Sequence, residues 1–160
     1  MAWLLAGGAV ISLAGCGFHL RGAVELPPQM ARTYIQGDPY GALERGLRAQ
    51  LQAAGARVVD EAAGATATLR VAAKHWQRRV LSVGADAKVS EYELSYRVTF
   101  SVQGREGDIL IPPEEVSVVR DFRFDPNDVL GKTGEQGLLR EEMERDMVQA
   151  IMRRIGHART

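Results

Sequence analysis

The single cysteine of this 160-residue chain, Cys16, is the side chain whose position most clearly predicts chemistry. A lone cysteine can form neither an internal disulfide nor a cysteine-rich zinc site. Its thiolate is a nucleophile, however, and can take up an acyl group. The residues before it, Leu13-Ala14-Gly15, are small or apolar and suit the groove of a peptidase. The sequence therefore predicts a processed, modified cysteine.

The segment before Cys16 contains no charged side chain and is apolar from Ala2 to Leu13. It is shorter than the ~20 residues that span a bilayer, but it matches the apolar region of a secretory signal. Its end resembles the bacterial lipobox, at which the signal is removed and the new N-terminal cysteine is diacylated. We therefore expect residues 1–15 to be a lipoprotein signal peptide and residues 16–160 to be the mature domain. The alternative is that Cys16 is a buried apolar thiol at the end of an N-terminal helix.

Acylation of Cys16 would decide where the protein resides. Two or three acyl chains, at ~0.8 kcal/mol per buried CH₂, anchor a protein stably to a membrane that it does not span. In bacterial lipoproteins, aspartate directly after the cysteine commonly retains the protein at the inner membrane, and this chain has Gly17 there. The expected location is the periplasmic face of the outer membrane.

Two segments have the apolar spacing of amphipathic helices. In the first, Asp38 and Pro39 are placed as N-cap and first helical residue, which predicts a helix over 39–54. In the second, the capping-box spacing of Thr133 and Gln136 precedes a predicted helix over 134–156. The apolar rows are Leu43, Leu47 and Leu51 in the first helix, and Leu139, Met143, Met147, Ile151 and Ile155 in the second.

Strand patterns fill the rest of the chain. They cover residues 33–35, 68–74, 91–103 and 109–123, and Val58-Val59 is a further strand candidate. The two long segments alternate and are joined by a turn-forming segment, so they predict a hairpin, with an edge or a bulge at Pro112-Pro113. The expected fold is α+β, a two-layer sandwich in which two helices pack on one face of a roughly four-stranded, largely antiparallel or mixed sheet.

Several function classes are disfavoured by what the sequence lacks. Lys and Arg number 20 and Asp and Glu number 20, so no net positive charge attracts nucleic acid. His19, His75 and His157 lie far apart in sequence and give no metal-ligand spacing, and no cofactor is expected. Gly131-Lys132-Thr133 resembles the end of a phosphate-binding loop, but Pro126 stands where the first glycine belongs. An enzyme on an α+β scaffold therefore remains only a distant alternative.

One segment combines basic and apolar side chains around the expected connection between two strands. The basic residues are Lys74, His75, Arg78, Arg79 and Lys88, and the apolar residues are Trp76, Val80, Leu81 and Val83. Cations can bind the phosphates of an amphiphile while apolar side chains contact its acyl chains. The alternative is a solvated loop whose lysines and arginines extend into water.

Four segments together resemble the LptE family of lipopolysaccharide-assembly lipoproteins. They are Cys16-Gly17-Phe18-His19-Leu20-Arg21 after the lipobox, Gly37-Asp38-Pro39 before the first helix, Ala87-Lys88-Val89-Ser90-Glu91-Tyr92 entering a long strand, and Glu135-Gln136 in the last helix. The resemblance implies an outer-membrane lipoprotein with two helices on a four-stranded sheet. It also implies a plug inside the β-barrel LptD, one per barrel, that is needed for barrel assembly and takes part in lipopolysaccharide transport.

The resemblance further implies that family members bind lipopolysaccharide with a basic residue in the turn before the last helix, which is Lys132 here. A second basic contact is expected at the strand tip, where Arg78, Arg79 and Lys88 are the candidates. The alternative function is that of a generic envelope lipoprotein that binds another periplasmic protein or peptidoglycan.

Overall fold

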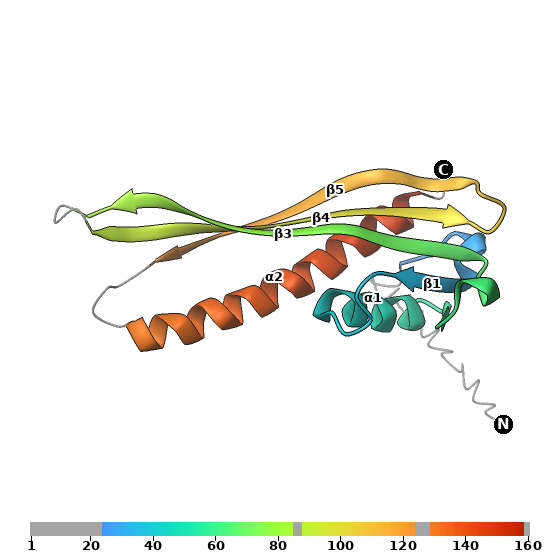
Figure 1. Cartoon of the computed structure of the whole chain (residues 1–160), viewed down its shortest axis with the longest axis horizontal. Helices are drawn as coiled ribbons and strands as arrows, with labels where there is room; N and C mark the ends of the chain where they lie inside the picture. The colour runs from blue at the N-terminus through green and yellow to red at the C-terminus, as the bar shows by residue number, and fades with distance from the viewer. Residues whose placement is uncertain (1–23, 85–87, 124–128, 159–160) are drawn as a thin grey trace, which may run out of the picture.

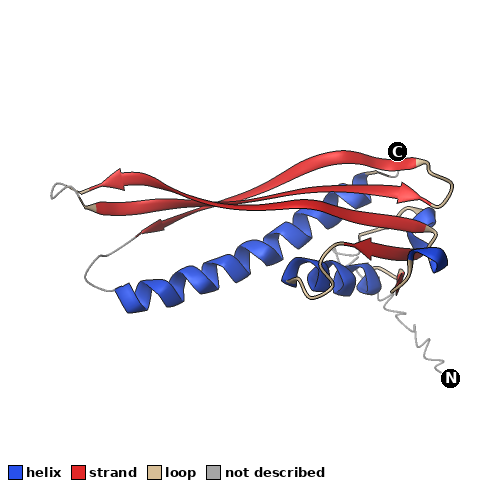
Figure 2. Cartoon of the chain, viewed as in Figure 1, coloured by secondary structure: helices blue, strands red, loops and turns tan. Residues whose placement is uncertain are grey.

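Two helices cover one face of a five-stranded sheet, as Figures 1 and 2 show. The computed structural model describes residues 24–84, 88–123 and 129–158. The strand order is β2-β1-β3-β4-β5. The strands are β1 (Arg32–Gln36), β2 (Arg57–Val59), β3 (Ala67–Val83), β4 (Val89–Gly104) and β5 (Ile109–Arg123), and the helices are α1 (Ala42–Ala53) and α2 (Val129–His157). The predicted α+β class is confirmed, with five strands instead of about four.

The long strands β3, β4 and β5 form the antiparallel part of the sheet. β5 has the bounds predicted by its alternating pattern, and β4 extends the predicted strand by one or two residues at each end. Pro112-Pro113 lies both at an edge and at an irregularity: β5 is the last strand of the sheet, and its register shifts between the pairs Phe100↔Glu114 and Val102↔Ile111. A proline lacks the N–H that a central strand must donate, which explains this placement.

β3 differs most from expectation, because it continues to Val83 where a connection was predicted beyond Lys74. Side chains on both faces of this part of β3 are at least partly exposed, so polarity does not alternate along it. The continuous pairing of Ala73 to Val80 with Thr99 to Tyr92 of β4 makes it a strand all the same. The part of the basic segment from Lys74 to Val83 therefore lies in a strand and not in a loop.

The short strands complete the other end of the sheet. β1 pairs in parallel with both β2 and β3, and α1 connects β1 to β2. The predicted start of α1 at residue 39, with Asp38 as its N-cap, is wrong, because Gly41 is the N-cap. The Asp38 carboxylate instead accepts a hydrogen bond from the Tyr40 N–H at 3.0 Å, in a turn before the helix. After the C-cap Ala54, Gly55 adopts a φ of 92°, a conformation that favours glycine and ends the helix.

α2 begins at Val129, five residues before the predicted start at 134, so Thr133 and Gln136 do not cap it. The predicted apolar row lies against the sheet. Its fully buried members are Met143, Met147, Ile151 and Ile155, which join Leu43, Leu47 and Leu51 of α1 and the inner side chains of β4 in one core. Within the described residues, no helix is both long enough and apolar enough to cross a membrane.

Candidate functional site

The predicted site residues fall in three places. Cys16 lies outside the described residues. Arg78 and Arg79 lie in β3, and Lys88 directly precedes β4. Lys132 lies in the first turns of α2, which corrects its predicted place in a turn before the helix. Figure 1 shows the start of α2 at the same end of the molecule as the C-terminal end of β3 and the N-terminal end of β4. The predicted basic contacts therefore lie at one end of the molecule.

We call the described ends of these two strands, residues 78–83 and 88–92, the tip. In the strand register, Arg78 lies opposite Leu94, which is buried beneath the helix layer, whereas Arg79 lies opposite Glu93 on the outer face. Neighbouring residues of a strand point to opposite faces of a sheet. The two arginines therefore diverge and cannot bind the same group.

Each of these arginines already has a partner within the protein. The Arg79 Nε lies 2.8 Å from a Glu93 carboxylate oxygen, and this hydrogen-bonded ion pair raises the pKa of the arginine. The guanidinium carbon of Arg78 lies 4.6 Å from the centre of the Tyr92 ring, a cation–π contact. Arg79 is thus paired with Glu93 on the outer face, whereas Arg78 lies on the helix-facing side of the tip.

The tip also exposes apolar side chains. Val80, Leu81 and Val83 are 51%, 41% and 61% exposed. Val80 lies opposite Tyr92, on the same face as Arg78. The predicted combination of cations and apolar groups is therefore present, and the helix-facing side of the tip carries both kinds.

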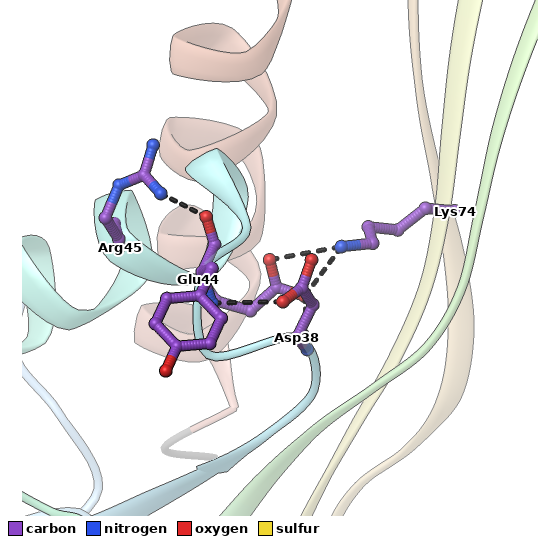
Figure 3. Close-up of polar contacts among 5 residues, drawn as sticks. Asp38, Glu44, Arg45 and Lys74 are labelled. Carbon is purple, nitrogen blue, oxygen red and sulfur yellow. Dashed lines mark hydrogen bonds and ion pairs between the residues drawn. The ribbon is translucent and has the colours of Figure 1, made fainter.

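Lys74 does not belong to the tip, which corrects the predicted basic cluster. Its Nζ donates to both carboxylate oxygens of Glu44 in α1, at 2.9 and 3.2 Å, as Figure 3 shows. Glu44 is only 4% exposed and also accepts a hydrogen bond from the Asp38 N–H at 3.2 Å. A Cβ on Gly41 would collide with a Glu44 oxygen, so the loop before α1 closes tightly around the carboxylate. Lys74 thus ties α1 to the sheet.

Glu144 of α2 faces the same cluster from the other helix. Its pKa is raised, mainly because partial burial disfavours the charged carboxylate. Its charged neighbours act in both directions: Glu44 and Glu141 raise the pKa, whereas Lys74 and Arg45 lower it. The two helices therefore bring two carboxylates toward one lysine.

Because the pKa of Glu144 is higher in the folded than in the unfolded chain, its ionisation destabilises the fold as pH rises through these two values. We expect Glu144→Gln to raise the free energy of unfolding by about 0.5 kcal/mol at pH 7, since solvent screens the partly exposed carboxylate, and to change it little near pH 4. Urea unfolding at both pH values measures this. The exposed Glu141→Gln variant on the same helix is the control and should gain less. A loss of stability on replacing Glu144 at pH 7 would contradict the expectation.

A stacked aromatic pair that the sequence did not predict lies below the tip. The rings of Trp76 and Tyr96 lie parallel, with centres 4.0 Å apart, and the Arg140 guanidinium of α2 lies 5.5 Å from the centre of the Trp76 ring. Burial raises the pKa of Tyr96. The alternation of β4 predicted an inward Tyr96, but nothing in the sequence placed Trp76 opposite it. In the described part of the chain, no three potential metal ligands gather in one place.

Comparison with known proteins gives a consistent assignment. The LptE family, described as lipopolysaccharide-assembly, matches residues 30–155. The LPS-assembly lipoprotein LptE of Pectobacterium atrosepticum is 35% identical over 95% of this chain and 83% of its own length. That of Yersinia enterocolitica is 31% identical over 95% of this chain and 73% of its own length.

Solved structures agree in fold. The solution structure of lipoprotein B from Nitrosomonas europaea has a TM-score of 0.72 at 30% identity and covers 88% of this chain and 90% of that one. The crystal structure of the rare lipoprotein B from Shewanella oneidensis has a TM-score of 0.69 at 29% identity and covers 79% of this chain and 94% of that one. With two helices over a mixed sheet and a match that covers most of its length, this chain belongs to the LptE family of lipopolysaccharide-assembly lipoproteins.

Proposed function

We propose that this chain is a non-enzymatic, lipid-anchored subunit of the outer membrane that fills the lumen of the LptD β-barrel and supports its assembly. One copy would occupy each barrel, bind lipopolysaccharide and take part in its transport. The family match over residues 30–155 carries the proposal. Residues 1–15 would be the signal peptide, and Cys16 would carry the lipid that holds the domain at the periplasmic face of the membrane.

The uncovered face of the sheet supports a role inside a barrel. The side chains of β4 that point away from the helices are polar: Ser95, Arg97, Thr99, Ser101 and Gln103. The lumen of an outer-membrane barrel is polar and wet, so a plug needs a hydrophilic surface of mixed charge. Zero formal net charge and this polar face both suit such a surface.

For lipopolysaccharide, the proposed contacts are Lys132 and the helix-facing side of the tip. Arg78 and Val80 share that side, so a phosphate could meet a cation while an acyl chain meets an apolar surface. Arg79 points to the opposite face and is paired with Glu93, which makes it the weaker candidate. Lys88 is exposed directly before β4 and remains a candidate for the second contact.

Charge reversal at Lys132 is expected to weaken binding of lipopolysaccharide about tenfold, the loss typical of one charge-assisted hydrogen bond. The reason is that the cation is replaced by a group that repels phosphate. Titration of the full-length protein in neutral detergent with purified lipopolysaccharide measures the change. Arg153→Glu, an exposed position near the other end of α2, is the matched control and should bind normally. Unchanged binding by the Lys132 variant, with the melting temperature also unchanged, would remove Lys132 from the site.

Association with the LptD barrel is tested by isolating the tagged native protein from outer membranes in mild detergent. The proposal expects a β-barrel partner in stoichiometric amount. Recovery of peptidoglycan or of another periplasmic protein, without a barrel and without affinity for lipopolysaccharide, would instead identify a generic envelope lipoprotein.

A further inference from the structure

The two edges of β3 differ in how much of their length is paired with a neighbouring strand. One edge pairs with β4 along nearly the whole strand, whereas the other pairs with β1 only from Ala67 to Arg70. Beyond Arg70, no strand among the described residues pairs with this second edge, which Figure 1 shows running on past the end of β1. We call the part from Ala73 to Val80 the open edge. Alternate residues along such an edge direct their N–H and C=O groups away from the sheet.

The open edge has a regular backbone, unlike the other long edge of the sheet. β5 has Pro112 and Pro113 at a shift in its register, and both features hinder pairing with a further strand. In β3, register shifts occur between Val71 and Ala73 and again after Val80, but none lies between these limits. The open edge is therefore a continuous stretch that can hydrogen-bond to another strand.

Side chains along the open edge define what could pair with it. His75, Gln77 and Arg79 lie on the outer face, and the helix-facing side has Lys74, Trp76, Arg78 and Val80. The segment has three Lys or Arg residues and no acidic one, and two of the three, Lys74 and Arg79, are paired with Glu44 and Glu93 of other elements. A second copy pairing antiparallel about the middle of this segment would place basic side chains against one another, which disfavours a symmetric dimer.

We propose that the open edge accepts an extended segment of a partner protein in which acidic and apolar side chains alternate. The acidic side chains would lie on the outer face beside His75 and Arg79, and the apolar ones would cover Trp76 and the exposed Val80 on the other face. The added strand would make the sheet six-stranded, with main-chain hydrogen bonds giving affinity and the alternation giving specificity. Binding of this segment does not require the barrel, but lipopolysaccharide would compete with it for Val80.

Hydrogen exchange of the full-length protein in neutral detergent tests this directly, with a short end-blocked peptide of alternating glutamate and valine as the probe. The peptide should slow exchange of alternate amides between Ala73 and Val80 by about tenfold or more, since these N–H groups gain acceptors. Amides of β5 should not change. A peptide in which lysine replaces glutamate should have no effect. A peptide of the same composition, in which all glutamates are grouped together and all valines follow them, should also have no effect.

A matched pair of variants separates an effect at the open edge from a general effect of added negative charge. His75 and Ser117 both lie opposite Arg97 on the outer face, one on β3 and one on β5. His75→Glu and Ser117→Glu each add one negative charge beside Arg97, but only the first should weaken peptide binding, by about threefold or more. Equal weakening by both variants would overturn the proposal. So would absence of protection, equal protection by the control peptides, or the same protection by phosphatidylglycerol vesicles.

Discussion

Replacing Lys74 with methionine is expected to lower the free energy of unfolding by about 3 kcal/mol, the loss typical when one member of a buried ion pair is removed. The reason is that Glu44 would remain almost fully buried without the cation that binds both of its oxygens. Burying an ionised carboxylate without a partner is strongly unfavourable, and methionine fills the space without replacing the charge. Urea unfolding at pH 7 measures the change.

The double variant Glu44→Gln with Lys74→Met is the control for this prediction. A neutral amide at position 44 removes the unpaired charge and can still accept the hydrogen bond from the Asp38 N–H. The double variant should therefore be more stable than Lys74→Met alone, by about 1–2 kcal/mol. If Lys74→Met costs less than about 0.5 kcal/mol, the pair behaves as an exposed surface ion pair and does not tie α1 to the sheet.

The second large effect concerns the crossing of the two helices. A Cβ on Gly46 of α1 would lie 2.7 Å from the Cγ2 of Val148 in α2, closer than real Cβ contacts allow. Gly46→Val should therefore destabilise the domain by about 2–3 kcal/mol through overpacking. Glycine and valine differ little in helix propensity, so the change reports mainly on the contact between the helices. Thermal and urea unfolding measure it.

Two further variants make this interpretation testable. Val148→Ala in the Gly46→Val background removes the opposing methyl groups and should restore more than half of the loss. Gly134→Val in α2 introduces the same side chain where the added Cβ has no neighbour within 4 Å beyond the adjacent residues and the helix's own backbone, and it should be nearly neutral. If Gly46→Val and Gly134→Val have equal effects, close helix packing at Gly46 does not contribute to stability.

Periodicity predicted the parts of the fold in which one face of an element is buried. β4 and β5 alternate because their inner side chains face the core, and the row from Met143 to Ile155 of α2 is buried for the same reason. The end of β3 was missed because neither of its faces is fully covered, so its polarity follows no period. The start of α2 was misplaced because local capping chemistry at Thr133 is compatible with a helix end but does not require one.

The contacts of the candidate site were harder to predict, because they join residues that are distant in sequence. Lys74 and Glu44 are 30 positions apart, and the basic cluster in the sequence gave Lys74 the wrong role. One signal was available: Glu44 is seven positions before Leu51 and so lies on the apolar face of α1. A carboxylate there requires a partner, although the sequence does not identify it. The divergence of Arg78 and Arg79 likewise follows only once the segment is known to be a strand.

Depletion of the protein from living cells is the decisive test of its proposed role in barrel assembly, with the amount of correctly assembled LptD barrel in the outer membrane as the readout. We expect assembled barrel and newly exported surface lipopolysaccharide both to fall as the protein is lost, and re-expression of the intact chain to restore them. Normal barrel assembly and normal surface lipopolysaccharide in fully depleted cells would contradict it.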